Sequence, residues 1–189
     1  MKKILSGLIF LMSSSLLQAQ ILKNFEPANG ITSSFQEVVK AYSHNYYSIQ
    51  GEKISAAEDV DIYAVKQSLP GAVQSSLMRF HSLQDTTAAY QAIMYKGENY
   101  KEASKLYHQL YQQVKRAVIE EEGHKLKFHG EFEAPDDDVR FTVTSLALDG
   151  EVSTYKNFFA EIELTQVYLE WEVRINLHSR KEDAEKLNY

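Results

Sequence analysis

The sequence predicts an α+β protein in which two helices pack on one face of a mainly antiparallel sheet. Two segments, 35–50 and 100–115, carry apolar residues at helical spacing, and each is followed by strand-like runs. The last of these runs alternate between apolar and polar residues, which is typical of a sheet with one dry face and one wet face. We therefore expect two αβββ-like units that share one sheet.

The N-terminal segment is typical of a secretory signal. Two lysines precede an apolar run over 4–17, which is shorter than the roughly 20 residues that cross a bilayer. The small residue Ala19 suits a cleavage site, so we predict a signal peptide over 1–19 and an N-terminal extension over 20–31. Because no cysteine follows the apolar run, a lipoprotein anchor is not expected. The predicted location is the periplasm or the cell exterior, with no stable membrane span after cleavage.

The composition excludes several classes of site. The 189 residues include no cysteine, so disulfides, thiolate zinc sites and cysteine nucleophiles are excluded, and stability must come from the hydrophobic core. Without the two N-terminal lysines the chain carries 18 basic and 26 acidic side chains, a formal charge of −8. A phosphate backbone requires clustered lysine and arginine, so no nucleic-acid partner is expected.

The first helix is predicted over 35–50. Ser34 stands three residues before Glu37, the spacing of a capping box, in which a short polar side chain and a glutamate each bond a backbone N–H group. Gly51 is well placed to end this helix. The apolar positions that define its buried face are Phe35, Val38, Val39, Tyr42, Tyr46 and Ile49.

The second helix has a matching start, because Asn99 stands three residues before Glu102. The next glycine is Gly123, and the helix is predicted to run on towards it. The apolar positions of its buried face are Tyr100, Ala103, Leu106, Tyr107, Leu110, Tyr111 and Val114.

We interpret the two helices as part of an internal duplication with an offset of 65 residues. The turn prolines Pro70 and Pro135 show the same offset. The first unit would cover 32–96, the second unit, with an extra strand, would cover 97–179, and a polar tail would follow over 180–189. Together they would form one globular domain. The identical helix positions are Glu37/Glu102, Lys40/Lys105, Tyr42/Tyr107 and Tyr46/Tyr111.

The C-terminal strands show the clearest alternation in the chain. Over 167–177 the apolar residues occupy odd positions, whereas over 158–164 they occupy even positions. A bulge or tight turn is therefore expected near Thr165–Gln166. Asp149-Gly150 suits a two-residue hairpin turn before these strands.

A candidate metal site lies in the segment KLKFHGEFE. If this segment is extended, His129, Glu131 and Glu133 share one strand face, and an imidazole with two carboxylates could hold a cation. A solvated strand face has the same pattern, and we favour that interpretation. The three aspartates over 136–138 lack the alternating ligands and central glycine of an EF-hand, so we expect an exposed hairpin tip there. No cofactor is expected.

Glu170 and Glu172 project from the same predicted strand face, near the spacing that paired carboxylates use in glycoside hydrolysis. Alternation alone also places such neighbours on a wet face, so the pattern does not identify an acid–base pair. The chain has no GxSxG elbow, no phosphate-cradling glycine-rich loop and no HExxH pair. Catalysis is therefore less expected than binding.

Aromatic residues are frequent, with twelve tyrosines and nine phenylalanines. Most tyrosines of the two helices fall on the apolar faces, where we expect them at the helix–sheet boundary. Tyr47 and Tyr168 fall outside those faces, and a tyrosine whose hydroxyl stays in water suits an interface. Together with Glu170 and Glu172, they are the predicted partner-binding residues.

The sequence therefore favours a secreted, non-enzymatic binding or protein-interaction module whose partner is an envelope protein. One alternative is a carrier of a small ligand, a lipid or a sugar, with an aromatic-lined pocket between helices and sheet. A second alternative is an envelope hydrolase. A homodimer formed by extension of the sheet at an exposed edge strand is also compatible with the sequence.

Overall fold

The computed structural model describes residues 30–81, 88–149 and 152–180. The predicted signal peptide, nearly all of the predicted N-terminal extension and all but the first residue of the polar tail lie outside these ranges. Among the described residues, no helix combines the length and the apolar character needed to cross a membrane.

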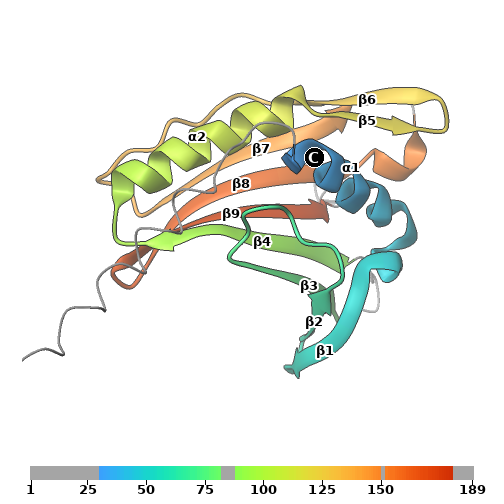
Figure 1. The fold of residues 1–189 in the computed structure, drawn as a ribbon, viewed down its shortest axis with the longest axis horizontal. Helices are drawn as coiled ribbons and strands as arrows, with labels where there is room; N and C mark the ends of the chain where they lie inside the picture. Colours follow the sequence, from blue (N-terminus) through green and yellow to red (C-terminus); the bar gives the residue numbers. More distant parts are fainter. Residues whose placement is uncertain (1–29, 82–87, 150–151, 181–189) are drawn as a thin grey trace, which may run out of the picture.

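The described chain forms two α-helices and nine β-strands, which Figure 1 shows in sequence colours. The helices are α1 (Gly30–Ala41) and α2 (Tyr100–Arg116). The strands are β1 (Gln50–Ala56), β2 (Val60–Val65), β3 (Gln74–Phe80), β4 (Ala88–Gly97), β5 (Val118–Glu121), β6 (His124–His129), β7 (Phe141–Asp149), β8 (Phe158–Val167) and β9 (Glu170–Ser179).

All nine strands form one antiparallel sheet with the order β1-β2-β3-β4-β9-β8-β7-β6-β5. Each half of the chain is a meander, and the last strands of the two halves, β4 and β9, pair at the centre. Both helices lie on one face of this sheet (Figure 1), with α2 over β8, β9 and β6 and α1 against β5. This arrangement confirms the predicted α+β fold.

The number of strands corrects the predicted αβββ-like units, because four strands follow α1 and five follow α2. The additional strands lie next to the helices. β1 begins at Gln50, up to which the first helix was expected to run, and β5 occupies the predicted extension of the second helix. Both helices end earlier than the sequence pattern suggested, and the chain after each helix joins an edge of the sheet.

The predicted helix over 35–50 is wrong at both ends, because α1 begins at Gly30 and ends at Ala41. Ser34 consequently lies within the helix and not at its N-cap. Gly51 lies in β1 and does not end the helix.

The residue that terminates this helical segment is Asn45, which adopts a left-handed backbone conformation with φ of 51°. The N–H of Asn45 donates to the C=O of Tyr42, and the N–H of Tyr46 donates to the C=O of Ala41, both at 2.8 Å. These two bonds are those of a Schellman motif, in which asparagine is the commonest substitute for glycine. The Asn45 side chain also accepts a bond from the N–H of Ala88, at 2.7 Å. Asn45 was the termination signal that the sequence analysis overlooked.

The predicted start of α2 is confirmed. The Asn99 side chain accepts hydrogen bonds from the N–H groups of Lys101 and Glu102, at 3.1 and 3.3 Å. The predicted end is wrong, because the helix stops at Arg116. Gly123, towards which the helix was expected to run, has a φ of 83° and lies in the turn between β5 and β6.

The core lies between the helices and the sheet. Tyr107 and Tyr111 of α2 are buried there, and the Tyr107 hydroxyl lies 2.6 Å from Thr144 Oγ1. Tyr46 is fully buried and donates a hydrogen bond from its hydroxyl to the C=O of Leu177 on β9, at 3.0 Å. The expectation that these tyrosines belong to the helix–sheet boundary is confirmed for these buried members.

β8 and β9 are joined by a two-residue turn at Tyr168 and Leu169, with Val167 paired to Glu170. This corrects the turn predicted at Thr165–Gln166. A hairpin with a two-residue turn pairs odd positions with even ones, so the change of phase in the sequence did indicate a hairpin. The turn was misplaced because no glycine, asparagine or proline marks it.

Two further turns differ from expectation. Asp149 ends β7, but β8 begins only at Phe158, after a short 3-10 segment at Ser153–Tyr155. The connection is therefore longer than the two-residue turn predicted at Asp149-Gly150. β6 ends at His129, so the segment KLKFHGEFE is a strand only in its first part.

Candidate functional site

The face of the sheet turned away from α1 and α2, here called the helix-free face, carries a continuous network of polar side chains. It starts on β4, where Gln91 donates to Asn176 Oδ1 at 2.9 Å. Asn176 donates to Glu163 at 3.2 Å, and Arg174 contacts Glu163 at 3.2 Å. The alternation of β8 and β9 produces this network, because it places their polar residues on one face in paired register.

The network continues to Glu172 and Glu170, two of the predicted partner-binding residues. Arg174 Nη2 lies 2.6 Å from Glu172, and Lys96 Nζ lies 3.4 Å from Glu172 and 3.3 Å from Glu170. The structure therefore brings the two glutamates together on one ammonium group. The Glu172 side chain is nevertheless only 6% exposed, so most of it is unavailable to a partner.

The electrostatics of Glu172 oppose a role as a general acid. Burial raises the pKa of its carboxyl, but the hydrogen bonds and charges of Arg174 and Lys96 outweigh burial and lower that pKa below its ordinary value. A catalytic acid at neutral pH requires the opposite shift. The pairing therefore favours a structural role for this carboxylate.

A second group of charges lies at the other end of β9, around Glu161. Its carboxylate accepts bonds from His178 Nε2 at 2.9 Å and from Ser145 Oγ at 3.1 Å, and it contacts the guanidinium of Arg180. The hydrogen bond from His178, together with the positive charges of His178 and Arg180, overcomes burial and lowers the pKa of Glu161 to about 2.

The β8–β9 turn is the most exposed apolar feature of the described chain. Tyr168 is 95% exposed and Leu169 is 80% exposed. The φ of Tyr168 is 57°, a left-handed conformation that side chains with a Cβ rarely adopt. Val139 and Phe141 are about half exposed at the same end of the sheet, because Phe141 pairs with Thr165 near the end of β8. We call these four residues the apolar tip.

Tyr47, the other predicted partner-binding tyrosine, lies in the connection between α1 and β1 and is 64% exposed. The guanidinium of Arg79 lies 4.0 Å from the centre of its ring, in a cation–π contact. Its neighbour Tyr46 bonds to Leu177, near the end of β9 opposite to Tyr168. The structure therefore does not bring the two predicted tyrosines together.

The predicted metal ligands His129, Glu131 and Glu133 are all exposed, and only His129 lies in a strand. Their three ligand atoms do not all lie within 4.8 Å of one another in the described chain. The backbone of the segment after His129 is held instead by other groups. Tyr111 donates to the C=O of Gly130 at 3.3 Å, and the N–H of Glu133 donates to Thr144 Oγ1 at 3.0 Å. The metal site stays a prediction that this geometry does not favour.

The side chains of Asp136, Asp137 and Asp138 do lie within 4.8 Å of one another, and all three are exposed. Asp136 Oδ1 accepts the N–H of Asp138 at 3.0 Å, which is an Asx-turn. The three residues lie in the loop between β6 and β7. This geometry agrees with the expectation of an acidic loop tip.

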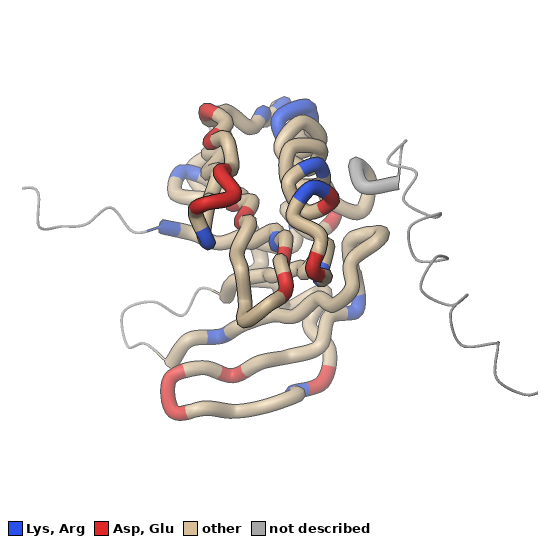
Figure 2. Tube along the Cα trace, turned by 90° about the vertical axis from the view of Figure 1, so that its left-hand side faces the viewer, with Lys and Arg blue, Asp and Glu red and all other residues tan. Residues whose placement is uncertain are grey.

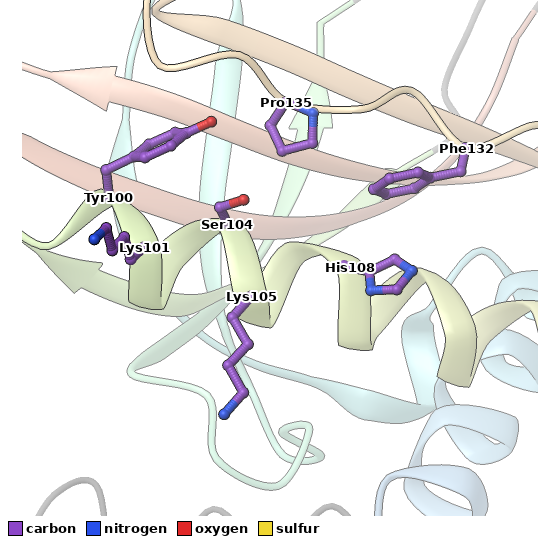
Figure 3. A pocket seen from close by; sticks show the side chains of 7 residues that line it. All are labelled: Tyr100, Lys101, Ser104, Lys105, His108, Phe132 and Pro135. Carbon is purple, nitrogen blue, oxygen red and sulfur yellow. The ribbon is translucent and has the colours of Figure 1, made fainter.

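An open groove of about 420 Å³ runs between the outer side of α2 and the segment after β6. Figure 3 shows Tyr100 and Ser104 on the helix facing Pro135, and His108 facing Phe132. The ring centres of His108 and Phe132 are 4.9 Å apart. Lys101 and Lys105 complete the lining. This groove could not be predicted from the sequence, because its walls come from segments about 30 residues apart that no pattern connects.

Acidic and basic residues are interspersed along the described trace (Figure 2). Of the predicted site residues, Tyr168 alone belongs to a prominent exposed feature, and Leu169, Phe141 and Val139 were not predicted to join it. The available signal was the change of phase between β8 and β9, which predicted a bulge or a tight turn but did not show which residues form it.

Comparison of the chain with family models, with curated proteins and with solved structures found no match.

Proposed function

We propose that this protein is a secreted, non-enzymatic binding module that captures a partner protein of the cell envelope with the apolar tip at the β8–β9 turn. The observation that carries this proposal is the conformation and exposure of Tyr168, which is 95% exposed at a positive φ. Tyr47, which packs on Arg79, is not part of the proposed surface.

The residues of this turn are poorly suited to folding alone. A two-residue hairpin turn with a positive φ at its first central residue normally takes glycine, and polar residues dominate such turns. A residue with a Cβ in the left-handed region costs about 1–2 kcal/mol, and two apolar side chains in water contribute no burial in return. Local strain that the fold does not require is frequent at functional sites. We therefore attribute Tyr168 and Leu169 to recognition.

The composition of the tip suits a protein interface. Tyrosine is enriched among the residues that dominate binding energy, and such residues lie in an apolar centre with a polar rim. Here Tyr168, Leu169 and Phe141 would form the centre. Lys96 and Glu170, each nearly half exposed and paired at 3.3 Å, would form part of the rim. In this proposal Glu172 supports the rim, because its carboxylate is bonded to Lys96 and Arg174.

The decisive experiment replaces the turn by one that folding prefers. In the variant Tyr168→Gly/Leu169→Asn, relief of the left-handed strain, about 1–2 kcal/mol, is partly offset by the entropy of glycine, about 0.5–1 kcal/mol. We expect thermal stability equal to or above that of the unmodified protein. We also expect loss of a specific crosslinked partner in a pull-down of the tagged protein from the envelope fraction of its own cells, read by mass spectrometry.

The matched control is Tyr47→Ser, which removes a similarly exposed tyrosine far from the tip and should leave capture intact. A partner retained by the turn variant but lost in Tyr47→Ser would contradict the proposal. Sedimentation of the purified protein distinguishes partner capture from self-association through β1, the exposed edge strand of the sheet.

The second candidate function, a small-ligand carrier, is favoured by the groove between α2 and the segment after β6. Its volume of about 420 Å³ lies within the range of small-molecule sites. Tyr100 and Phe132 could pack on the ring of a sugar or the apolar part of a lipid, and Ser104 could donate a hydrogen bond.

If this groove holds a ligand, native mass spectrometry of the protein from its own host should show a bound mass. The variant Ser104→Trp, which fills the groove, should then lose that mass. Gln109→Trp, on the same helix but outside the groove, should keep it. A bound mass that both variants retain would place the ligand elsewhere, and repeated spectra of the free protein alone would count against the carrier function.

We also retain as proposals the internal duplication and the secreted location. The duplication is supported by the order of elements, since each half is a helix followed by a meander, and Pro70 and Pro135 each lie between the second and third strands of their half. The location rests on the sequence pattern of residues 1–19. N-terminal sequencing of the mature protein should begin at Gln20, and an intact Met1 would contradict cleavage.

A further inference from the structure

His178 occupies a position in which both ring nitrogens face acceptors. Its Nε2 lies 2.9 Å from a Glu161 carboxylate oxygen, and its Nδ1 lies 3.1 Å from the C=O of Ser179. Neither a carboxylate nor a carbonyl can donate a hydrogen bond. Both contacts are satisfied together only when both nitrogens carry a proton, which is the imidazolium form.

The surrounding groups support this assignment. From β8, Phe159 pairs with His178, and the carboxylate of Glu161 faces the ring. Arg180, directly after the same strand, carries the positive charge that opposes protonation of His178, and its guanidinium contacts Glu161. Continuation of the β4–β9 register beyond the Tyr90–Leu177 pair places the uncharged Ala89 beside His178, and the Ser145 hydroxyl of β7 also carries no charge. Within the described chain, one carboxylate therefore neutralises two cations.

Glu161, His178 and Arg180 lie where the C-terminal end of β9 pairs with β8. The N–H of Arg180 donates to the C=O of Asn157 at 2.9 Å, which closes the β8–β9 pairing at this end. The guanidinium of Arg180 lies 4.9 Å from the ring centre of Phe159 and contacts both Glu161 and Ser145. Glu161 is the common partner of His178, Ser145 and Arg180, so its carboxylate links the polar side chains at this end of β9.

We propose that His178 and Glu161 form a pH-sensitive latch that fastens the C-terminal end of β9 when the imidazole is protonated and loosens it when the proton is lost. Such a latch makes the attachment of residues 179–180 to β8 respond to the surrounding pH. The proposal does not depend on the binding function of the apolar tip, which lies at the other end of β9.

The direction of the effect follows from linkage. The hydrogen bond and charge of Glu161 raise the pKa of His178 above its ordinary value of 6.5. A raised pKa contributes stability that is complete below pH 6.5 and is lost as the pH rises through the folded-state pKa. The pKa of Glu161 is lowered from 4.5 to about 2, so its contribution is complete above pH 4.5 and is lost towards pH 2. The latch is therefore fully closed between about pH 4.5 and 6.5.

The test measures the unfolding equilibrium of the full chain in urea from about pH 5.5 to about pH 8.5. The unmodified protein should become easier to unfold with rising pH. Its equilibrium constant of unfolding should increase by up to tenfold for each unit by which the pKa of His178 in the folded protein exceeds its pKa in the unfolded chain. His178→Gln should lose most of this dependence. His81, paired with Asp61 at 3.4 Å, also has a raised pKa and titrates in the same direction. His81→Gln is therefore the matched control, and it should retain the dependence due to His178.

A second measurement needs no variant. Side-chain nitrogen NMR should show that more than half of His178 is doubly protonated at pH 6.5, and the hydrogen-exchange protection of the Arg180 amide should fall as His178 loses its proton. Titration of His178 at or below pH 6.5, or equal pH dependence in the unmodified protein and in His178→Gln, would overturn the proposal. Titration above pH 6.5 with no change in protection at Arg180 would also overturn it, because the imidazole would then not act as a latch.

Discussion

Replacement of Tyr46 by alanine is expected to lower the free energy of unfolding by about 3–5 kcal/mol, the range for loss of a large buried aromatic side chain. Tyr46 has no exposed surface, and its ring lies between Tyr42 and Tyr90, at centre-to-centre distances of 5.9 and 6.3 Å. Its hydroxyl also joins the α1–β1 connection to Leu177 of β9. Since a domain of this size is stabilised by only about 5–15 kcal/mol, such a loss would remove much of its stability.

Two variants separate the sources of this effect in urea unfolding experiments. Tyr46→Phe keeps the ring and removes only the hydrogen bond to Leu177, and it should cost about 1–2 kcal/mol. Tyr47→Ala changes the adjacent exposed tyrosine and removes only its contact with Arg79, so it should cost less than about 1 kcal/mol. Equal effects of Tyr46→Ala and Tyr47→Ala would contradict the burial of Tyr46.

Replacement of Gly130 by alanine should have the second large effect, a loss of about 1–3 kcal/mol or more. A Cβ at this position would lie 2.3 Å from the C=O oxygen of Ser145 and 3.2 Å from the Cα of Leu146. Both are backbone atoms of β7 that no side-chain rotation can move. The clash would push the segment after β6 away from β7 and disturb the hydrogen bonds that Tyr111 and Lys115 donate to the C=O of Gly130.

Gly123→Ala is the control for this prediction. A Cβ at Gly123 would meet no atom within 4 Å, but its φ of 83° is unfavourable for alanine. This variant should therefore lose only the free energy that the left-handed backbone costs a residue with a Cβ, about 1–2 kcal/mol. The two variants therefore lose stability for different reasons, which are the close approach to β7 at Gly130 and the backbone conformation at Gly123. If urea midpoints show no greater loss for Gly130→Ala, the close approach of Gly130 to β7 would be disproved.

The polar network of the helix-free face and the apolar tip have different physical roles. The carboxylates of this face are paired with cations, and the pKa values of Glu161 and Glu172 are lowered, which suits ionised partners of ion pairs rather than general acids. The tip exposes apolar side chains on a strained turn and has no ionisable group suited to acid–base chemistry apart from the tyrosine itself. These observations are the reason that we propose binding at the tip rather than hydrolysis.

The local features of the fold could be predicted from the sequence where a short pattern determines them. The N-cap of α2 depended only on Asn99 and the following turn. The alternation of 158–164 and 167–177 predicted two strands with opposite phase, and this phase determined which residues face the helices. These predictions succeeded because capping and alternation are properties of neighbouring residues.

The remaining features required contacts between distant residues. The end of α1 was decided by Asn45, whose left-handed conformation is supported by its bond to Ala88 and by the bond that its C=O accepts from Arg79. The groove beside α2 arose from bonds between tyrosines of the helix and the backbone after β6. None of these contacts follows from local spacing.

By itself, the sequence determined the class of fold, the buried faces of the helices and the C-terminal strands, and the presence of Tyr168 outside the apolar pattern. Only the tertiary structure decided that β4 and β9 join the two halves and that Tyr168 and Leu169 form an exposed turn near Phe141. It also decided that Glu161 gathers His178 and Arg180 at the other end of β9. The physical reason is that alternation specifies the face of each side chain, whereas strand order and register depend on long-range pairing.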